Sequence, residues 1–79
     1  MTTRIQFRTT HAPRTVRDVN ARLAARGVAE RLVRGKDYYY FSGGTSESWF
    51  TSSVYVARVS DLSIDSWMAE YDRLSDYER

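Results

Sequence analysis

The hydrophobic and polar positions along this chain predict a short helix, several strands and a second helix. Residues 16–26 place apolar side chains at helical spacing, after a potential cap at Thr15 and before Gly27. Residues 64–77 show that spacing more clearly, with Ser63 as the expected N-cap. The apolar side of this second segment consists of Ile64, Trp67, Met68, Tyr71 and Leu74. Both helices are therefore expected to pack against a common core.

Between the two helices, alternating side chains predict a β-hairpin followed by a third strand. Residues 29–33 and 38–42 are the expected arms, joined by a turn at 34–37 in which Gly35 is free to take positive φ. Residues 53–59 alternate in the same way and contain several β-branched side chains. The sequence therefore predicts three neighbouring strands in the middle of the chain.

The second hairpin arm contains four consecutive aromatic residues within the block Tyr-Tyr-Tyr-Phe-Ser-Gly-Gly at 38–44. Successive side chains of a strand point to opposite faces. Tyr38 and Tyr40 therefore share one face, while Tyr39 and Phe41 share the other. One face can belong to the core. The other is expected to be covered by another element or presented to a partner.

These elements together predict a small α+β fold. Residues 3–9 also alternate, with Ile5 and Phe7 on one side, so residues 1–14 are interpreted as an edge strand or a loose arm. The element order is then (β)-α-β-β-β-α, which favours an antiparallel sheet with both helices packed on one face. A chain of 79 residues is expected to form a single domain, 1–79.

The composition excludes several kinds of site. The chain has no cysteine, so it cannot have a disulfide framework, a thiolate nucleophile or a cysteine-based metal site. This absence favours a reducing, cytoplasmic setting. No apolar run approaches the ~18 residues of a membrane span, and the first residues lack the apolar stretch of a signal peptide. We therefore expect a soluble cytoplasmic protein with no membrane contact.

Charge is distributed unevenly along the chain. Residues 1–36 contain nine Arg or Lys against two acids, and residues 37–79 contain eight acids against three Arg. The basic half could attract phosphate, whereas the acidic half would repel it. The basic side chains of the first helix either contact a nucleic-acid backbone or pair with the acidic second helix. These side chains are Arg14, Arg17, Arg22 and Arg26.

Catalytic patterns are largely missing from the sequence. His11 is the only histidine, lies in a predicted connector and has no second metal-ligand candidate nearby. No Ser or Thr lies in a nucleophile-elbow pattern. Residues 43–46 lack the lysine and the following helix of a phosphate-binding loop. We therefore predict a protein that is not an enzyme and that requires no cofactor and no metal.

Residues 34–41 partly resemble the aromatic strand motif of RNA-recognition domains, in which a basic residue and a glycine precede aromatics that stack on bases. The matching positions are Arg34, Gly35, Tyr38 and Phe41. Asp37 departs from the motif, because its charge is unfavourable beside a phosphate. The order of elements differs as well, and ordinary sheet packing explains the same residues.

A more extensive resemblance covers roughly residues 28–75. The chain resembles a family of small uncharacterised proteins that are common in phages, prophages and plasmids. The segments that carry it are 36–44, Trp49, 53–56, 61–63 and 67–71. Asp37 stands where the family pattern has glycine. Small cysteine-free proteins of such mobile elements include anti-CRISPR inhibitors, which dock on a Cas protein and block DNA or subunit binding, so the resemblance implies this possibility.

The first functional hypothesis is therefore a non-catalytic binding protein of a bacterial mobile element, expected to be a monomer, whose partner is a host protein or complex such as a Cas effector. Two surfaces are candidates. The acidic face of the last helix could occupy a basic groove, and it consists of Asp65, Asp72 and Asp76 with Glu70 nearby. An aromatic patch could anchor a protein partner, and it consists of Tyr38, Tyr40, Trp49 and Tyr55.

The alternative hypothesis is a small nucleic-acid-binding module. In that case the tyrosines would stack on bases, while the arginines of the first helix would contact phosphates. The two hypotheses differ in the expected salt dependence, because phosphate contacts weaken steeply as salt increases.

Overall fold

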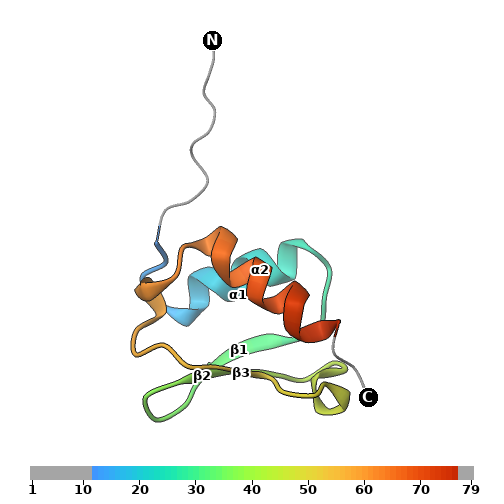
Figure 1. Ribbon diagram of the computed structural model, residues 1–79. Helices are drawn as coiled ribbons and strands as arrows, with labels where there is room; N and C mark the ends of the chain where they lie inside the picture. Colours follow the sequence, from blue (N-terminus) through green and yellow to red (C-terminus); the bar gives the residue numbers. More distant parts are fainter. Residues whose placement is uncertain (1–11, 77–79) are drawn as a thin grey trace.

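The described part of the chain, residues 12–76 of the computed structural model, forms a three-stranded antiparallel sheet with two helices on one face (Figure 1). The elements are α1 (Val16–Ala25), β1 (Arg31–Arg34), β2 (Tyr39–Ser42), β3 (Ser53–Val54) and α2 (Ile64–Ser75), with 3₁₀ helices η2 (Ser46–Ser48) and η3 (Val59–Asp61). The strands are ordered β1-β2-β3. The predicted α+β fold with both helices on one face is confirmed. The strand expected at residues 3–9 lies outside the described residues.

Helix α1 begins at Val16 as predicted and ends at Ala25, one residue before the predicted end at Arg26. The carboxylate of Asp18 accepts a hydrogen bond from the backbone N–H of Arg14 at 2.7 Å. This N–H lies just before the first turn and has no partner within the helix. At the other end Gly27 has φ 79, and its N–H donates to the carbonyl of Ala24 at 2.9 Å. The N–H of Val28 donates to the carbonyl of Leu23, three positions before the cap, at 3.4 Å. This is the left-handed glycine termination of a helix.

The hairpin forms, but its turn differs from the expectation. Strand β1 pairs with β2 so that Leu32 is opposite Phe41 and Arg34 is opposite Tyr39. The residue with positive φ is Asp37, at 66°, and not Gly35 as predicted. Gly35 is required for another reason. A Cβ at this position would lie 2.6 Å from the ring of Tyr38, which covers the glycine.

The positive φ of Asp37 predicts an order of stability among variants at this position. Asp tolerates the left-handed region better than most residues, but glycine adopts it without steric cost. Asp37→Gly is therefore expected to raise the free energy of unfolding by about 0.5 kcal/mol, and Asp37→Ala to lower it by about 1 kcal/mol. Urea unfolding of the three proteins measures both changes. A stability of Asp37→Ala equal to that of the parent chain would contradict the strained turn.

The third strand is shorter than predicted. Alternation suggested residues 53–59, but only Ser53 and Val54 pair with β2. The chain then leaves the sheet, because η3 is held against α2. The indole Nε1–H of Trp67 donates to the carbonyl of Val59 at 2.8 Å, and the carboxylate of Asp61 accepts from the N–H of Arg58 at 3.0 Å. Contacts with the helix layer therefore end the strand.

The core lies between the inner face of the sheet and the two helices. Trp67 of α2 is fully buried, and the rings of Tyr39 and Trp67 meet edge to face at 5.6 Å between centroids. Tyr71 contacts Phe41 in the same geometry at 5.5 Å. Edge-to-face pairs add about 0.5–1.5 kcal/mol each to the stabilisation from burial. The aromatic density of the chain thus supplies the core that so short a domain needs.

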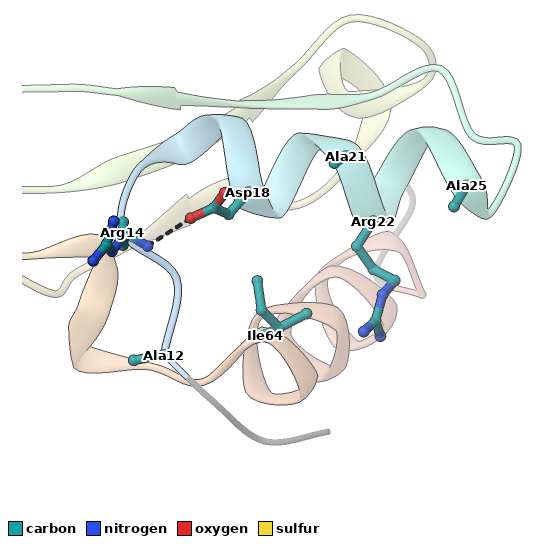
Figure 2. Close-up of a pocket in the computed structure, with 7 residues that line it drawn as sticks. All are labelled: Ala12, Arg14, Asp18, Ala21, Arg22, Ala25 and Ile64. Atoms are coloured by element: carbon teal, nitrogen blue, oxygen red, sulfur yellow. Dashed lines mark hydrogen bonds between the residues drawn. The ribbon is translucent and has the colours of Figure 1, made fainter. Parts of the chain in front are cut away.

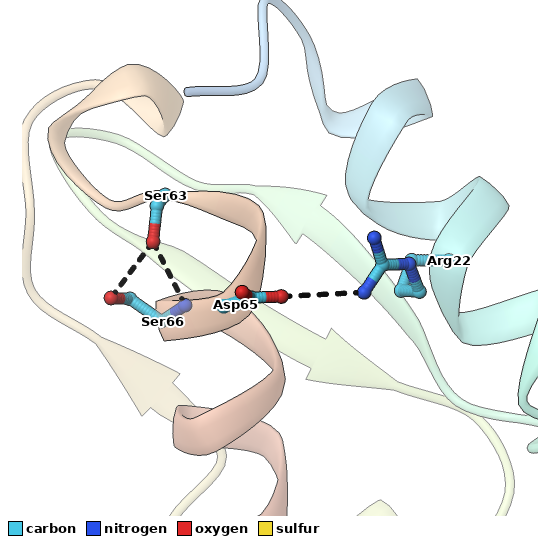
Figure 3. Close-up of polar contacts among 4 residues, drawn as sticks. All are labelled: Arg22, Ser63, Asp65 and Ser66. Atoms are coloured by element: carbon cyan, nitrogen blue, oxygen red, sulfur yellow. Dashed lines mark hydrogen bonds and ion pairs between the residues drawn. The ribbon is translucent and has the colours of Figure 1, made fainter. Parts of the chain in front are cut away.

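Helix α2 agrees with its prediction through the described residues. The Ser63 hydroxyl accepts a hydrogen bond from the backbone N–H of Ser66 at 3.1 Å, which confirms the N-cap (Figure 3). The predicted apolar positions of this helix are all buried. None of the helices within residues 12–76 is long and apolar enough to cross a bilayer.

Candidate functional site

The face of the sheet opposite the helices carries a cluster of tyrosines. Strand β2 buries Tyr39 and Phe41, so Tyr40 points to the other side, where Tyr38 and Tyr55 also lie. The ring centroids of Tyr38 and Tyr40 are 5.9 Å apart, and so are those of Tyr38 and Tyr55. Tyr55 is 79% exposed, while the other two are half-buried. We call these three residues the tyrosine cluster.

The strand register shows what surrounds the cluster. Val33 of β1 and Ser53 of β3 lie on either side of Tyr40, and Arg31 lies opposite Ser42. The resulting surface, here called the outer face, consists of Arg31, Val33, Tyr38, Tyr40, Ser42, Ser53 and Tyr55. None of these side chains is acidic. Figure 1 shows α1 and α2 on the other side of the sheet.

Trp49 does not belong to the exposed aromatic patch, and its assignment there is wrong. The side chain is only 3% exposed, its ring contacts Phe41 and Tyr71, and its Nε1–H donates to the Thr45 hydroxyl at 3.1 Å. The 3₁₀ helix η2 turns the chain so that Trp49 enters the core. Its neighbour Phe50 is instead 75% exposed. Strand alternation could not predict that Trp49 would be buried and Phe50 exposed, because the segment that contains them is not a strand.

Two of the predicted acidic site residues pair with arginines of the neighbouring helix. Asp65 lies 3.4 Å from Arg22, and Asp72 lies 2.7 Å from Arg26 (Figure 3 shows the first pair). These contacts confirm the interpretation that the basic first helix pairs with the acidic second helix. Exposed ion pairs contribute only about 0–1 kcal/mol each, so they orient α1 and α2 more than they stabilise them.

The other two predicted acidic site residues, Glu70 and Asp76, make no ion pair with α1 within residues 12–76. Glu70 pairs with Arg73 one turn later on the same helix. Asp76 caps the C-terminal end of α2 and makes no ion pair within the described part of the chain. The acidic face is therefore a surface of mostly paired charges. It offers a basic partner less free negative charge than the sequence suggested.

The layered fold separates the two groups of residues that a nucleic-acid module would need. The tyrosine cluster lies on the outer face, whereas Arg22 and Arg26 lie in the helix layer, where they contact α2. Arg31 is the one basic side chain of the outer face. Its guanidinium donates to the carbonyls of Val28 and Glu30, each at 2.7 Å. One single-stranded nucleic acid therefore cannot readily stack its bases on the tyrosine cluster and contact the arginines of α1 at the same time.

A buried carboxylate that the sequence analysis missed holds the glycine loop in place. Glu30 is 4% exposed and accepts hydrogen bonds from the N–H of Thr45 at 2.7 Å, the Thr45 hydroxyl at 3.0 Å and the Tyr71 hydroxyl at 2.7 Å. Gly44 has φ 55, and a Cβ there would collide with this carboxylate. The glycine pair is thus explained by close approach to Glu30. Nothing in the pattern around Glu30 marks it as buried.

The protonation states of this pair are set by burial and by the hydrogen bonds. Burial alone raises the pKa of Glu30, but the hydrogen bonds from Thr45 and Tyr71 together outweigh it and leave that pKa below its ordinary value. Burial and the contact with Glu30 raise the pKa of Tyr71 to about 12. The carboxylate is therefore ionised and the phenol protonated at neutral pH. The pair acts as a structural link between α2 and the loop before β3.

This link predicts a pH dependence of stability at both extremes. The contribution of Glu30 is fully present above its ordinary pKa of 4.5 and is lost as the pH falls through its lower folded value. The contribution of Tyr71 is fully present below pH 10.0 and is lost as the pH rises toward about 12. Urea unfolding across pH measures both, with Tyr71→Phe as the control. An unchanged alkaline dependence in that variant would contradict the assignment.

A shallow groove opens beside α1 and the first turn of α2, with a volume of about 470 Å³ (Figure 2). Its lining consists of Ala12, Arg14, Asp18, Ala21, Arg22, Ala25 and Ile64. Asp18 and Arg22 are already engaged in the cap of α1 and in the ion pair to Asp65. Among residues 12–76, no group of three or more His, Asp or Glu side chains could hold a metal ion. The groove therefore presents no recognisable catalytic set.

Of the surfaces that the sequence suggested, the outer face keeps its aromatic side chains accessible, while the acidic face has most of its charges paired. Comparison with known protein families, with curated proteins and with solved structures found no match to this chain.

Proposed function

We propose that this chain is a non-catalytic protein-binding domain that docks through its outer face. The observation that carries the proposal is the tyrosine cluster, in which the ring of Tyr38 contacts the rings of Tyr40 and Tyr55 on the side of the sheet opposite α1 and α2. Tyrosine is among the residues most enriched at the energetic centres of protein interfaces. Each ring can bury a large area on binding, and its hydroxyl remains available for a hydrogen bond.

The composition of the outer face fits a protein partner better than a polyanion. Its tyrosines lie on the same face as Ser42 and Ser53, and it contains no lysine. Tyrosine and serine are also the main residues of antibody binding loops. There the rigid ring supplies contact area at low entropic cost, and the hydroxyl adapts its hydrogen bonding. A nucleic-acid surface would need several free basic side chains around the rings.

The sharper form of the proposal follows the resemblance to proteins of mobile elements. In this form the domain acts in the bacterial cytoplasm as an anti-CRISPR inhibitor, a monomer whose outer face docks on a Cas effector and blocks DNA or subunit binding. The absence of a recognisable catalytic set in the groove is compatible with inhibition by occlusion. The proposal of a docking surface does not depend on this identity of the partner.

A comparison of variants tests the proposed function. The tagged domain is used to capture proteins from native host cells, alongside Tyr55→Ala and Asp65→Asn. We expect a protein captured by the parent chain to be retained by Asp65→Asn and lost with Tyr55→Ala. Both substitutions are on exposed side chains, so neither should unfold the domain.

A parallel titration separates protein binding from the nucleic-acid alternative. Labelled single-stranded DNA and RNA are titrated with the domain at low and at moderate salt. The proposal predicts no saturable binding at either condition. Tight binding at low salt that weakens steeply as salt increases would favour the nucleic-acid module instead, because phosphate contacts release counterions.

A further inference from the structure

The two edges of the sheet differ in how their backbone groups are satisfied. At the β1 edge, the side chain of Asn20 pairs with the peptide groups of Leu32. Its Oδ1 accepts from the Leu32 N–H at 2.6 Å, and its Nδ2 donates to the Leu32 carbonyl at 3.1 Å. This amide occupies the positions that an added strand would use. Helix α1 therefore blocks the β1 edge at Leu32.

The β3 edge is open in the described part of the chain. The N–H of Phe41 donates to the carbonyl of Ser52 at 2.9 Å, so the backbone of Ser52 faces β2. Because strand residues alternate in direction, the backbone groups of Ser53 point away from β2. Tyr55 follows the last paired residue of β3, and its ring lies on the outer face beside Tyr38. The Ser53 N–H makes one long contact, 3.4 Å to the Thr51 hydroxyl. Its carbonyl accepts no hydrogen bond from residues 12–76.

This open edge also lacks most of the features that protect sheet edges. Residues 48–57 contain no charged residue and no proline, whereas lysine, proline and inward-pointing charges usually discourage strand addition. Its one protection is the short length of β3. Phe50 and Tyr55, the exposed large hydrophobic residues of the described chain, lie on this segment. The edge is thus bordered by accessible aromatic side chains and joins the tyrosine cluster.

We propose that the edge of β3 binds an extended segment of a protein partner as a fourth strand of the sheet. This inference rests on the proposed function and adds the mode of binding. The partner backbone pairs with the outward groups of Ser53 and continues the pairing to Tyr55, as in other complexes formed by strand addition. Side chains on one side of the added strand meet the tyrosine cluster, and those on the other lie beside Val54 and Val56. The segment is therefore uncharged, with β-branched or aromatic residues at alternate positions.

Random linear peptides displayed on phage provide a defined probe. Peptides selected on the parent domain are synthesised, and their affinities are measured for the parent, Ser53→Pro and Asn20→Ala. Proline at position 53 removes an outward N–H but no hydrogen bond to β2. We expect at least about a tenfold weaker affinity for Ser53→Pro and no weakening for Asn20→Ala, since Asn20 closes the opposite edge.

Hydrogen exchange of the parent domain gives a second measurement that needs no variant. Bound peptide should slow exchange of the Ser53 and Tyr55 amides. Failure to select any peptide, or binding without this protection, overturns the inference. Loss of binding with Tyr40→Ala but not with Ser53→Pro would also overturn it, while leaving the outer face as the docking surface. Self-association of the parent that Ser53→Pro abolishes would assign the edge to a second copy and overturn it too.

Discussion

Glu30→Ala is expected to lower the free energy of unfolding by about 3 kcal/mol, measured by urea unfolding at neutral pH. The substitution removes the acceptor of three hydrogen bonds, and hydrogen bonds to a charged group are each worth about 1.5–3 kcal/mol. The loss is limited because Thr45 is exposed and can bind water instead. The Tyr71 hydroxyl is left in the core without a partner.

Tyr71→Phe is the matched control for this prediction. It removes one donor from the carboxylate but leaves both contacts with Thr45, so its cost should be about 1–2 kcal/mol. Glu30→Ala should also release the glycine loop, which would appear as faster hydrogen exchange at the Thr45 amide. If Glu30→Ala costs no more than Tyr71→Phe, the carboxylate does not hold the loop.

The second large effect concerns binding. Replacing the tyrosine cluster with three alanines is expected to abolish binding of the partner, and Tyr55→Ala alone should weaken it by about 2 kcal/mol, roughly thirtyfold. Tyr55 is 79% exposed in the free domain, so its removal should change the free energy of unfolding little. Calorimetric titration of the purified partner measures the affinities.

Asp72→Asn provides the control for that series. It removes the charge that pairs with Arg26 and leaves the outer face untouched. Its affinity should remain within a few fold of the parent value. A large loss with Asp72→Asn together with unchanged binding of Tyr55→Ala would move the docking surface to the helix layer.

Local periodicity predicted most of the fold. Ser63 and the apolar spacing after it predicted α2. Alternation in the block at 38–44 predicted that one pair of aromatics could belong to the core and that the other would be covered by another element or presented to a partner. Both predictions depend on neighbours in the sequence and on the regular geometry of helix and strand. The same rules placed Gly27 at the end of α1. Each of these features is decided within a few residues.

Features decided by distant contacts could not be predicted in this way. Trp49 enters the core because η2 reverses the chain and Thr45 and Tyr71 receive its ring. Strand β3 ends early because Val59 is bound to Trp67. Glu30 is buried because the loop at Thr45 and the hydroxyl of α2 converge on it. These contacts join segments far apart in the sequence, and no local pattern encodes them.

In the candidate site, too, some features follow from local sequence and others depend on distant contacts. The aromatic side chains of the outer face, Tyr38, Tyr40 and Tyr55, could be assigned from alternation along the predicted strands, whereas the burial of Trp49 could not. The sequence could not decide whether the acidic residues of α2 would be paired. The distances from Asp65 and Asp72 to the arginines depend on how α1 and α2 cross. The pairing was one of two open interpretations of the charge pattern. The structure favours the outer face because it remains accessible after those pairs form.

Site-specific photocrosslinking can show directly whether the outer face is the docking surface. A photoreactive phenylalanine analogue replaces Tyr38 in one protein and Asp65 in another, and each is irradiated in native host cells. We expect a single protein adduct from position 38 and none from position 65. Adducts from position 65 alone, or adducts that contain nucleic acid in place of protein, would contradict it.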